Sequence, residues 1–347
     1  MDIVTLIINV GVLFIMMVPG IILKKCKFVN DGFGKGISNL VLYLAQPALI
    51  VYAYLSCESA FADIWKNCLV TLLLSLLAHV LFALATLWLF KRSPDNQRPM
   101  LQFATIFSNA AFMGIPLIQD IIGAEGAIYA SIYNISFNLF LWTLGVHLCT
   151  REKGKDMDGD GDSDITDELL SMKHHTKKEA SMLKLLLHPV TLASVIGVVL
   201  LVLGVNVSLL DNAGLSFITK SLDKISCLVA PLSMIVIGLR LPDVKLKGIF
   251  CDTGAYIFLL MRHFALPILI VLIMLLLSII GMPISYDTRV VITLLAATPA
   301  ASSAAMFAEK YNCDVPYVSR LVVISTIFSI ASMPLVIALL DFLFSLI

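Results

Sequence analysis

Long apolar runs separated by short polar links dominate the chain. Runs of this length fit helices that cross a hydrocarbon core of about 30 Å, for which about 20 apolar residues suffice, and not the shorter strands of a membrane barrel. We therefore predict an all-α polytopic membrane protein. The ten predicted spans have approximate bounds of 3–23, 37–56, 65–90, 100–121, 126–149, 185–206, 217–240, 252–280, 288–308 and 317–341.

Composition supports this interpretation, because 59% of the 347 residues are hydrophobic and only 14% are charged. The formal net charge is zero, so nothing points to a nucleic acid or another polyanion as a partner. The seven cysteines form no CxxC pair and read as small apolar packing residues. No cofactor is predicted. Asp2 precedes the first run and lysines follow it, which is the reverse of a cleavable signal peptide.

Lysine and arginine gather in alternate links, after the first, third, seventh and ninth spans. The link at 119–126, QDIIGAEG, has neither. Because cytoplasmic links carry an excess of basic residues, both termini are predicted to face outward from the cytoplasmic membrane. The basic residues that carry this assignment are Lys24, Lys25, Lys27, Lys35, Lys91, Arg92, Arg98, Arg240, Lys245, Lys247, Lys310 and Arg320.

One long polar segment, 150–184, divides the chain into halves at 1–149 and 185–347. Its mixture of charge and glycine cannot bury enough apolar surface to fold alone, so it is predicted to be a cytoplasmic linker. With five spans each, the halves would have opposite orientations, which predicts an inverted repeat. Shifting by 184 residues pairs Gly20 with Gly204, Pro47 with Pro231, His79 with His263 and Pro99 with Pro283, and one residue of slip pairs Pro116 with Pro299.

The fourth and ninth spans occupy matching places in these halves, and both carry helix-breaking sequences. Residues 108–118 read SNAAFMGIPLI, and residues 296–311 read AATPAASSAAMFAEKY. Pro116 and Pro299 remove an amide donor, and Gly114 allows close approach of two backbones. We therefore predict two broken helices that cross near the bilayer midplane and expose backbone amides to a polar guest, preferably a carboxylate. The alternative is two ordinary kinked helices held by small polar residues.

The same residues carry a resemblance to a known family. Asn109 with FMGIPL at 112–117, Thr298-Pro299, and AEKY at 308–311 are similar to motifs of the auxin efflux carrier family. His188-Pro189, APL at 230–232 and Ile237-Gly238 extend the similarity over nearly the whole chain. The resemblance implies ten spans with crossing broken helices, a scaffold part and a transport part, elevator-type alternating access, and often a homodimer. It also implies small organic anions as substrates, either dicarboxylates such as malate or malonate, as assigned to bacterial permeases, or auxin-like acids. The short central link favours the compact bacterial type.

Candidate substrate-binding residues surround the two breaks or face the expected cavity. They are Asn109, Met113, Gly114, Pro116, Thr298, Pro299, Ser302, Ser303, Gln46 and Asn138, with Asn39 and Asn134 as further polar candidates.

Three cationic or titratable residues within the spans are candidates for charge coupling. Arg262 lies about ten residues into the eighth span, where it could attract the anion, reset the empty carrier, or bond structurally to a carboxylate or carbonyl. His79 and His263 could couple transport to protons or could be structural hydrogen bonders.

The acidic linker contains a partial calcium-binding pattern. Asp156, Asp158, Asp160 and Asp162 follow EF-hand spacing, but Asp167 stands where the loop needs glutamate. A solvated linker is the simpler interpretation, with weak calcium binding as the alternative, and no other metal site is predicted.

The sequence therefore predicts a secondary active transporter for a small organic anion. Two alternatives are a sodium- or proton-coupled exchanger of similar architecture and a membrane receptor that does not transport. No nucleophile, base and orienting group share one leaflet, so an enzyme is not expected.

Overall fold

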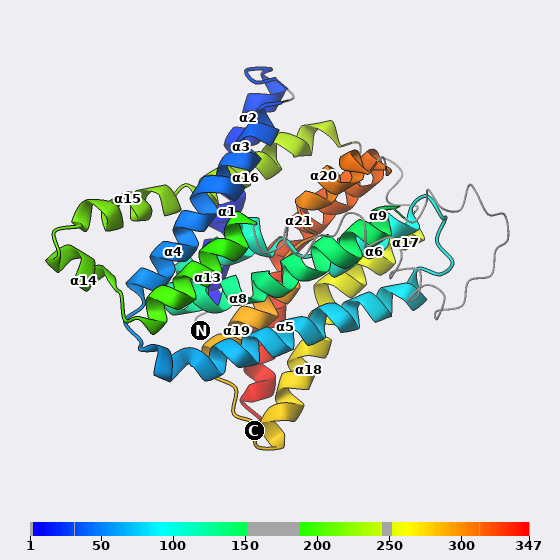
Figure 1. Ribbon diagram of the computed structural model, residues 1–347. Helices are drawn as coiled ribbons and strands as arrows, with labels where there is room; N and C mark the ends of the chain where they lie inside the picture. The colour runs from blue at the N-terminus through cyan, green and yellow to red at the C-terminus, as the bar shows by residue number, and fades with distance from the viewer. Residues whose placement is uncertain (1–2, 31, 151–187, 245–251, 312, 347) are drawn as a thin grey trace.

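The computed structural model describes residues 3–30, 32–150, 188–244, 252–311 and 313–346. Within these ranges the regular structure is helical, apart from one isolated β-bridge. The candidate calcium loop and most of the predicted linker lie outside the described residues. Figure 1 shows the arrangement.

The first half of the chain contains both long helices and short helical segments. They are α1 (Ile3–Ile15), α2 (Val18–Lys25), α3 (Phe33–Leu40), η1 (Val41–Ala45), α4 (Gln46–Ser56), α5 (Phe61–Leu89), α6 (Arg98–Ile106), η2 (Ala110–Gly114), α7 (Ile115–Ile122), α8 (Ala124–Phe140), η3 (Leu141–Gly145) and α9 (Val146–Thr150).

The second half continues in the same manner. Its elements are α13 (Pro189–Val202), α14 (Val207–Asn212), α15 (Ser216–Ser226), α16 (Val229–Arg240), η4 (Leu241–Asp243), α17 (Thr253–Leu260), η6 (Met261–Ala265), α18 (Leu266–Ile279), α19 (Tyr286–Ala297), α20 (Ser303–Lys310) and α21 (Val315–Phe344).

Seven helices in the described part of the chain are long and apolar enough to cross a membrane. The predicted span at 185–206 corresponds to the shorter α13, and the spans predicted at 100–121 and 288–308 are each interrupted. The chain is thus a multi-pass helical membrane protein, while the count of ten spans and the inverted repeat remain predictions. The seven long helices are Val4–Lys25, Phe33–Ser56, Phe61–Leu89, Ala124–Thr150, Ser216–Asp243, Thr253–Ile279 and Val315–Phe344.

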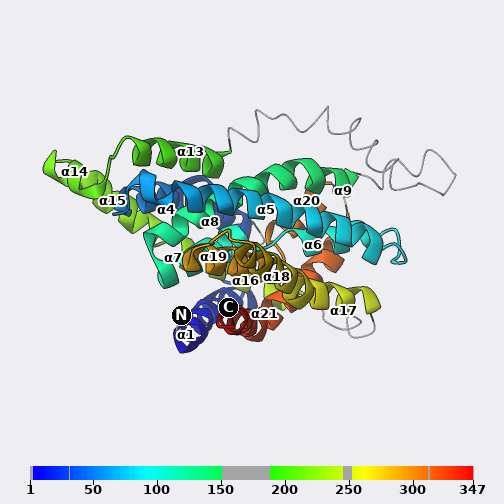
Figure 2. The ribbon, with the colours of Figure 1, turned by 90° about the horizontal axis from the view of Figure 1, so that it is seen from below.

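Packing gathers the helices into two groups that share an interface. In one group α13 and α15 pack on α4, and α2 and α3 pack on α16. In the other, α5 and α7 pack on α8, and α18 and α21 pack on α19. Contacts of α8 with α4 and of α1 with α21 join the groups, and Figure 2 shows α4 and α13 lying above α8.

The crossing of α2 and α16 brings backbone against backbone. A Cβ atom added at Gly238 would lie 2.1 Å from the carbonyl oxygen of Met17, and one added at Gly20 would lie 2.3 Å from that of Ile235. No side chain fits in such a gap, so glycine is required on both helices at this point.

Both chain termini lie away from the ends of α2, α9 and α20 (Figure 1). Lys24 and Lys25 end α2, and Lys310 ends α20. The structure thus separates the termini from the basic ends of α2 and α20, and the side of the membrane on which each lies remains a prediction.

Three helices widen by one residue just before a proline. The π-helical turns η1, η2 and η6 each end two residues ahead of a proline, at Pro47, Pro116 and Pro267 respectively. In each case the next amide bonds to a carbonyl five residues back. Proline cannot donate to the preceding turn and clashes with it, and the wider turn relieves that clash. These helices therefore continue through their prolines.

Candidate functional site

Two interrupted helices meet through their backbones. The first interruption is Phe107–Asn109, between α6 and η2, and the second is Thr298–Ser302, between α19 and α20. The amide of Asn109 donates to the carbonyl of Pro299 at 2.7 Å, and the amide of Ala301 donates to that of Phe107 at 2.9 Å. These bonds form an antiparallel bridge between Ser108 and Ala300. Each break thus satisfies the backbone groups that the other leaves open.

The position of the first break corrects the sequence interpretation. Pro116 does not interrupt the helix, because it lies in the first turn of α7 and follows the widened turn η2. The break lies several residues earlier, whereas Pro299 does lie within the second break. The paired positions are also further apart in sequence than the 184-residue shift that matched the prolines.

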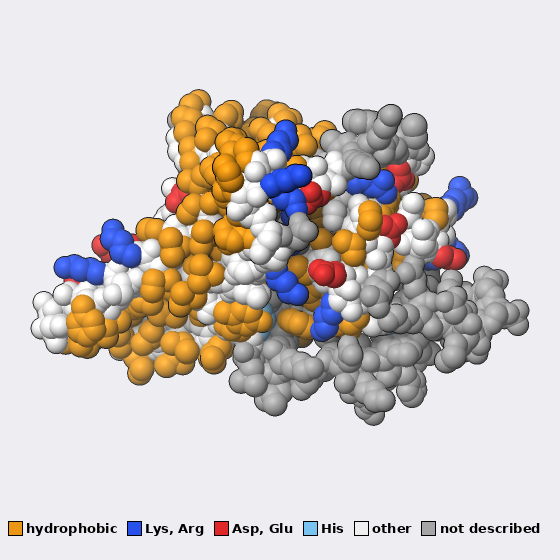
Figure 3. Space-filling view, turned by 90° about the horizontal axis from the view of Figure 1, so that it is seen from above, with side chains coloured by type: hydrophobic (Ala, Val, Ile, Leu, Met, Phe, Trp, Pro, Cys, Tyr) orange, Lys and Arg blue, Asp and Glu red, His pale blue; other side chains and the backbone are white. Residues whose placement is uncertain are grey.

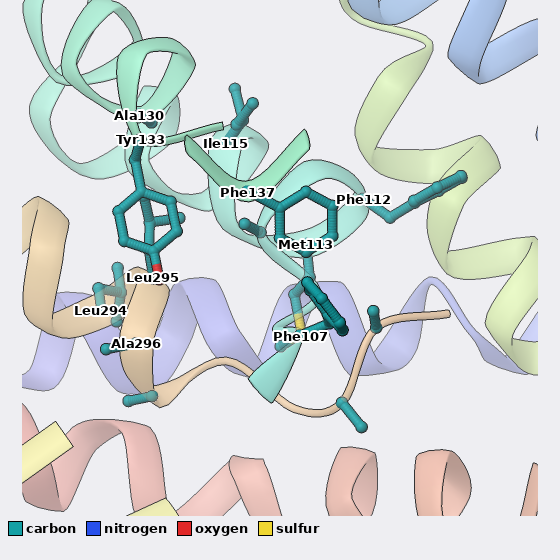
Figure 4. Close-up of a cluster of buried hydrophobic side chains, with 14 of the residues drawn as sticks. Phe107, Phe112, Met113, Ile115, Ala130, Tyr133, Phe137, Leu294, Leu295 and Ala296 are labelled. Atoms are coloured by element: carbon teal, nitrogen blue, oxygen red, sulfur yellow. The ribbon is translucent and has the colours of Figure 1, made fainter. Parts of the chain in front are cut away.

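Tight apolar packing holds the two paired breaks in place; this junction of Phe107–Asn109 with Thr298–Ser302 is called the crossing below. A Cβ at Gly114 would lie 2.4 Å from Cδ2 of Leu295, so this glycine lets η2 lie directly on α19, as predicted. The rings of Phe107 and Phe137 pack edge to face, with centroids 5.7 Å apart. Figure 4 shows Met113 close to both rings.

Arg262 binds the crossing from one side. Its Nε donates to the carbonyl of Thr298 at 3.0 Å, its Nη1 to that of Thr105 at 2.9 Å and its Nη2 to that of Ala296 at 2.8 Å. The side chain is fully buried. Of the roles predicted for it, the structural bonding to carbonyls is the one that the geometry displays.

Ser325 of α21 holds the second break from another side. Its buried hydroxyl accepts from the amide of Ala300 at 3.0 Å and donates to the carbonyl of Val322 at 3.1 Å. The amide of Ala300 has no helical carbonyl within reach, so this hydroxyl satisfies a donor that the interruption creates.

A cavity of about 1090 Å³ reaches the crossing. It is lined at its inner end by Ser108, Asn109, Ala301 and Ser303. Its volume suits a small organic molecule with its hydration.

Carboxamide side chains line the wall of the cavity near the crossing. Asn109 Nδ2, Gln46 Oε1 and Asn134 Oδ1 are buried without a protein partner. Gln46 Nε2 donates to the carbonyl of Ala111 at 3.0 Å, and Asn138 Nδ2 lies 3.4 Å from the hydroxyl of Thr191. Buried polar atoms normally have partners, so these unpaired atoms are free to bond to a polar guest or to water.

The outer part of the cavity is charged. Lys35 and Lys310 line it with the acids Asp243 and Glu309. Arg240 lines the cavity further in, where its guanidinium reaches the carbonyl of Ser302. Lys24 lines the outer part too and forms an ion pair of 2.9 Å with Asp243. Four basic and two acidic side chains leave a positive surplus, and Figure 3 shows Lys and Arg side chains gathered near the middle of the face seen from above. Such a surplus attracts anions.

The predicted site residues divide into two sets. Gln46, Asn109, Asn138 and Ser303 line the cavity, as do Asn39 and Asn134. The remaining predicted residues are absent from the lining and belong to the packing of the crossing: Met113, Gly114, Pro116, Thr298, Pro299 and Ser302.

The two histidines lie beside the crossing and away from the cavity lining. His79 Nδ1 is 2.7 Å from the carbonyl of Ser75, and its ring stacks on Phe140 with centroids 5.3 Å apart. His263 Nδ1 is 2.8 Å from the hydroxyl of Ser332. Both therefore have structural hydrogen bonds, and coupling to protons remains a prediction.

Arg240 is the residue that sequence reasoning missed in this role. It ends α16, and its Nη1 donates to the carbonyl of Ser302 at 2.6 Å. In the sequence it counted only as one of several basic residues flanking a span, with Lys245 and Lys247, and nothing in that pattern showed that it reaches the second break.

Interrupted apolar helices around a cavity that holds a few polar side chains are typical of helical membrane transporters. The chain belongs to the membrane transport protein family, whose model matches residues 5–337. This confirms the resemblance to auxin efflux carriers.

Two similar proteins are archaeal. One is an uncharacterized transporter of Methanothermobacter thermautotrophicus, which is 25% identical over 325 residues, covering 92% of this chain and 94% of the relative. Another is an uncharacterized transporter of Methanocaldococcus jannaschii, which is 24% identical over 323 residues, with the same coverage.

Proposed function

We propose that the protein is a secondary active transporter that moves a small organic anion across the cytoplasmic membrane by elevator-type alternating access. The observation that carries the proposal is the polar cavity that ends on the paired helix breaks. In this proposal the ten spans form two inverted repeats, and the two paired breaks form the inner end of the substrate site.

An anion is favoured by charge and by hydrogen bonding. The positive surplus at the cavity mouth raises the local concentration of anions. At the inner end, the unpaired Nδ2 of Asn109 is a donor that a carboxylate can accept from. The cavity wall described here holds no buried acid near the breaks, which disfavours a cation-binding exchanger as the alternative.

The cavity would then represent the state open to the cytoplasm. Its mouth carries basic residues of links that the charge pattern assigns to the cytoplasmic side. Movement of the crossing relative to α4 and α16 would carry the site to the opposite side. The helix groups described above supply a scaffold and a moving part for this step.

Counterflow in proteoliposomes tests the proposal. Vesicles loaded with an unlabelled acid are placed in a trace of the same labelled acid, using acetate, malonate, malate, succinate and indole-3-acetate in turn. At least one acid is expected to accumulate transiently, which a receptor that does not transport cannot produce. Failure of every acid to accumulate would contradict transport of a small carboxylate.

Asn109→Ala tests the site itself. Loss of a hydrogen bond to a charged solute should lower uptake of the active acid about tenfold or more, with expression unchanged. The matched control is Asn67→Ala, because Asn67 lies in α5 and its Nδ2 donates to the hydroxyl of Tyr129 at 3.2 Å, away from the cavity lining. Unchanged uptake in Asn109→Ala would remove this residue from the site.

A further inference from the structure

A buried cation sits where the two interrupted helices end. Arg262 lies in the widened turn η6 and has no exposed surface. Its three hydrogen bonds all go to main-chain carbonyls, of Thr105 in the last turn of α6 and of Ala296 and Thr298 at the end of α19. Two helix C-termini thus converge on one guanidinium.

The charges at this point balance. A helix C-terminus carries roughly half a negative elementary charge, so two of them supply about one. In the part of the chain that the structure describes, no carboxylate forms an ion pair with Arg262. The convergent carbonyls are therefore its counter-charge, and charge-assisted bonds to them offset the cost of burial.

In transporters built from interrupted helices, unwound carbonyls and half-helix C-termini are the usual ligands of a coupling sodium ion. We propose that Arg262 is a tethered cation that fills this position, so that the protein moves its solute without a sodium ion at the crossing. Coupling presupposes the transport proposed above, whereas occupation of the carbonyl site by a cation does not depend on any solute.

Arg262 acts in this proposal as a positioning residue. It is absent from the lining of the cavity, so it holds the breaks and does not touch the solute. Removing its side chain should leave three convergent carbonyls and a space in which a free cation can bind.

Thermal unfolding of purified protein in different salts tests the inference. Wild type and Arg262→Ala are compared at equal ionic strength in choline chloride, sodium chloride and low-millimolar guanidinium chloride. Wild type should unfold at the same temperature in choline and in sodium. Arg262→Ala should unfold at a lower temperature in choline and should regain about 5 °C, saturably, with sodium or guanidinium, because a ligand that binds the folded state stabilises it.

Two further variants separate a cation site from general damage. Arg262→Lys keeps a tethered charge and should remain independent of sodium. Arg289→Ala removes a guanidinium that lies 4.0 Å from the ring centroid of Phe344, and it should behave alike in all three salts.

Two results would overturn the inference. One is saturable stabilisation of the wild type, or of Arg262→Lys, by sodium. The other is a loss of stability in Arg262→Ala that neither sodium nor guanidinium reverses, which would indicate packing alone. If Arg262→Ala does not fold, the wild type and Arg262→Lys still decide. Absence of counterflow alongside the expected salt responses would contradict the proposed transport and leave the cation site standing.

Discussion

Single polar side chains complete the backbone bonding that the breaks leave open. The hydroxyl of Ser325 bonds the amide of Ala300, Arg262 bonds three carbonyls, and Arg240 bonds the carbonyl of Ser302. The sequence indicated polar residues within apolar runs but could not say which of them would bond to backbone. Ser325 and Arg240 lie far from the breaks along the chain, so no local pattern connects them.

Ser325→Ala should destabilise the protein by about 1–3 kcal/mol, because the buried amide of Ala300 loses its acceptor. Ser329→Ala is the matched control. Both serines are fully buried in α21, but the hydroxyl of Ser329 donates only to the carbonyl of Thr326 in its own helix, at 2.7 Å. Denaturant titration in detergent measures both variants. Equal losses would show that the bond to Ala300 contributes nothing special.

Helices that cross in close contact depend on glycine. The sequence predicted some of these contacts and helix ends correctly and others wrongly. The long apolar runs predicted helices and their rough bounds, while the count of ten spans remains a prediction beside the seven long helices of the described residues. Gly114 was predicted to allow close approach, and it does. The first break was misplaced, because Pro116 widens a helix instead of ending it. The true break at Phe107–Asn109 is set by pairing with residues almost two hundred positions away, which no local propensity encodes.

Gly238→Ala should lower the unfolding temperature and cost about 1–3 kcal/mol, because the new methyl group meets the backbone of Met17 and neither helix can yield without moving. Gly11→Ala is the control. Gly11 lies in α1 with no atom within 4 Å of an added Cβ, so alanine there should be neutral or stabilising by up to about 1 kcal/mol. Two variants of equal stability would show that α2 and α16 can separate freely.

At the scale of the whole molecule, the cavity runs from a positively charged mouth to an inner end at the two helix breaks. Apolar content was enough to predict a multi-pass membrane protein, while the sidedness of the links, inferred from the charge pattern, remains a prediction. A cavity at the breaks was expected, but its size and full lining could not be derived, because residues of both halves line it and their distances depend on the packing of all the helices. Asn39, Gln46, Asn134 and Asn138 were found as candidates because amides are rare in apolar spans.

Lys35→Gln tests the electrostatic part of this arrangement. Removing one charge from the cavity mouth should raise the KM of the transported acid about two- to fivefold at low ionic strength, with little change in maximal rate, and added salt should reduce the difference. Lys66→Gln is the control, because Lys66 lies beside Trp65 near the start of α5, outside the cavity lining. An equal effect of both variants would point to total charge and not to the cavity.

The bridge between Ser108 and Ala300 uses main-chain atoms alone. Its hydrogen bonds would form with almost any small residue at those two places, so mutation can alter the neighbouring side chains without undoing the junction. A junction made of main-chain atoms therefore tolerates the sequence divergence of the two archaeal relatives, which are about a quarter identical to this chain.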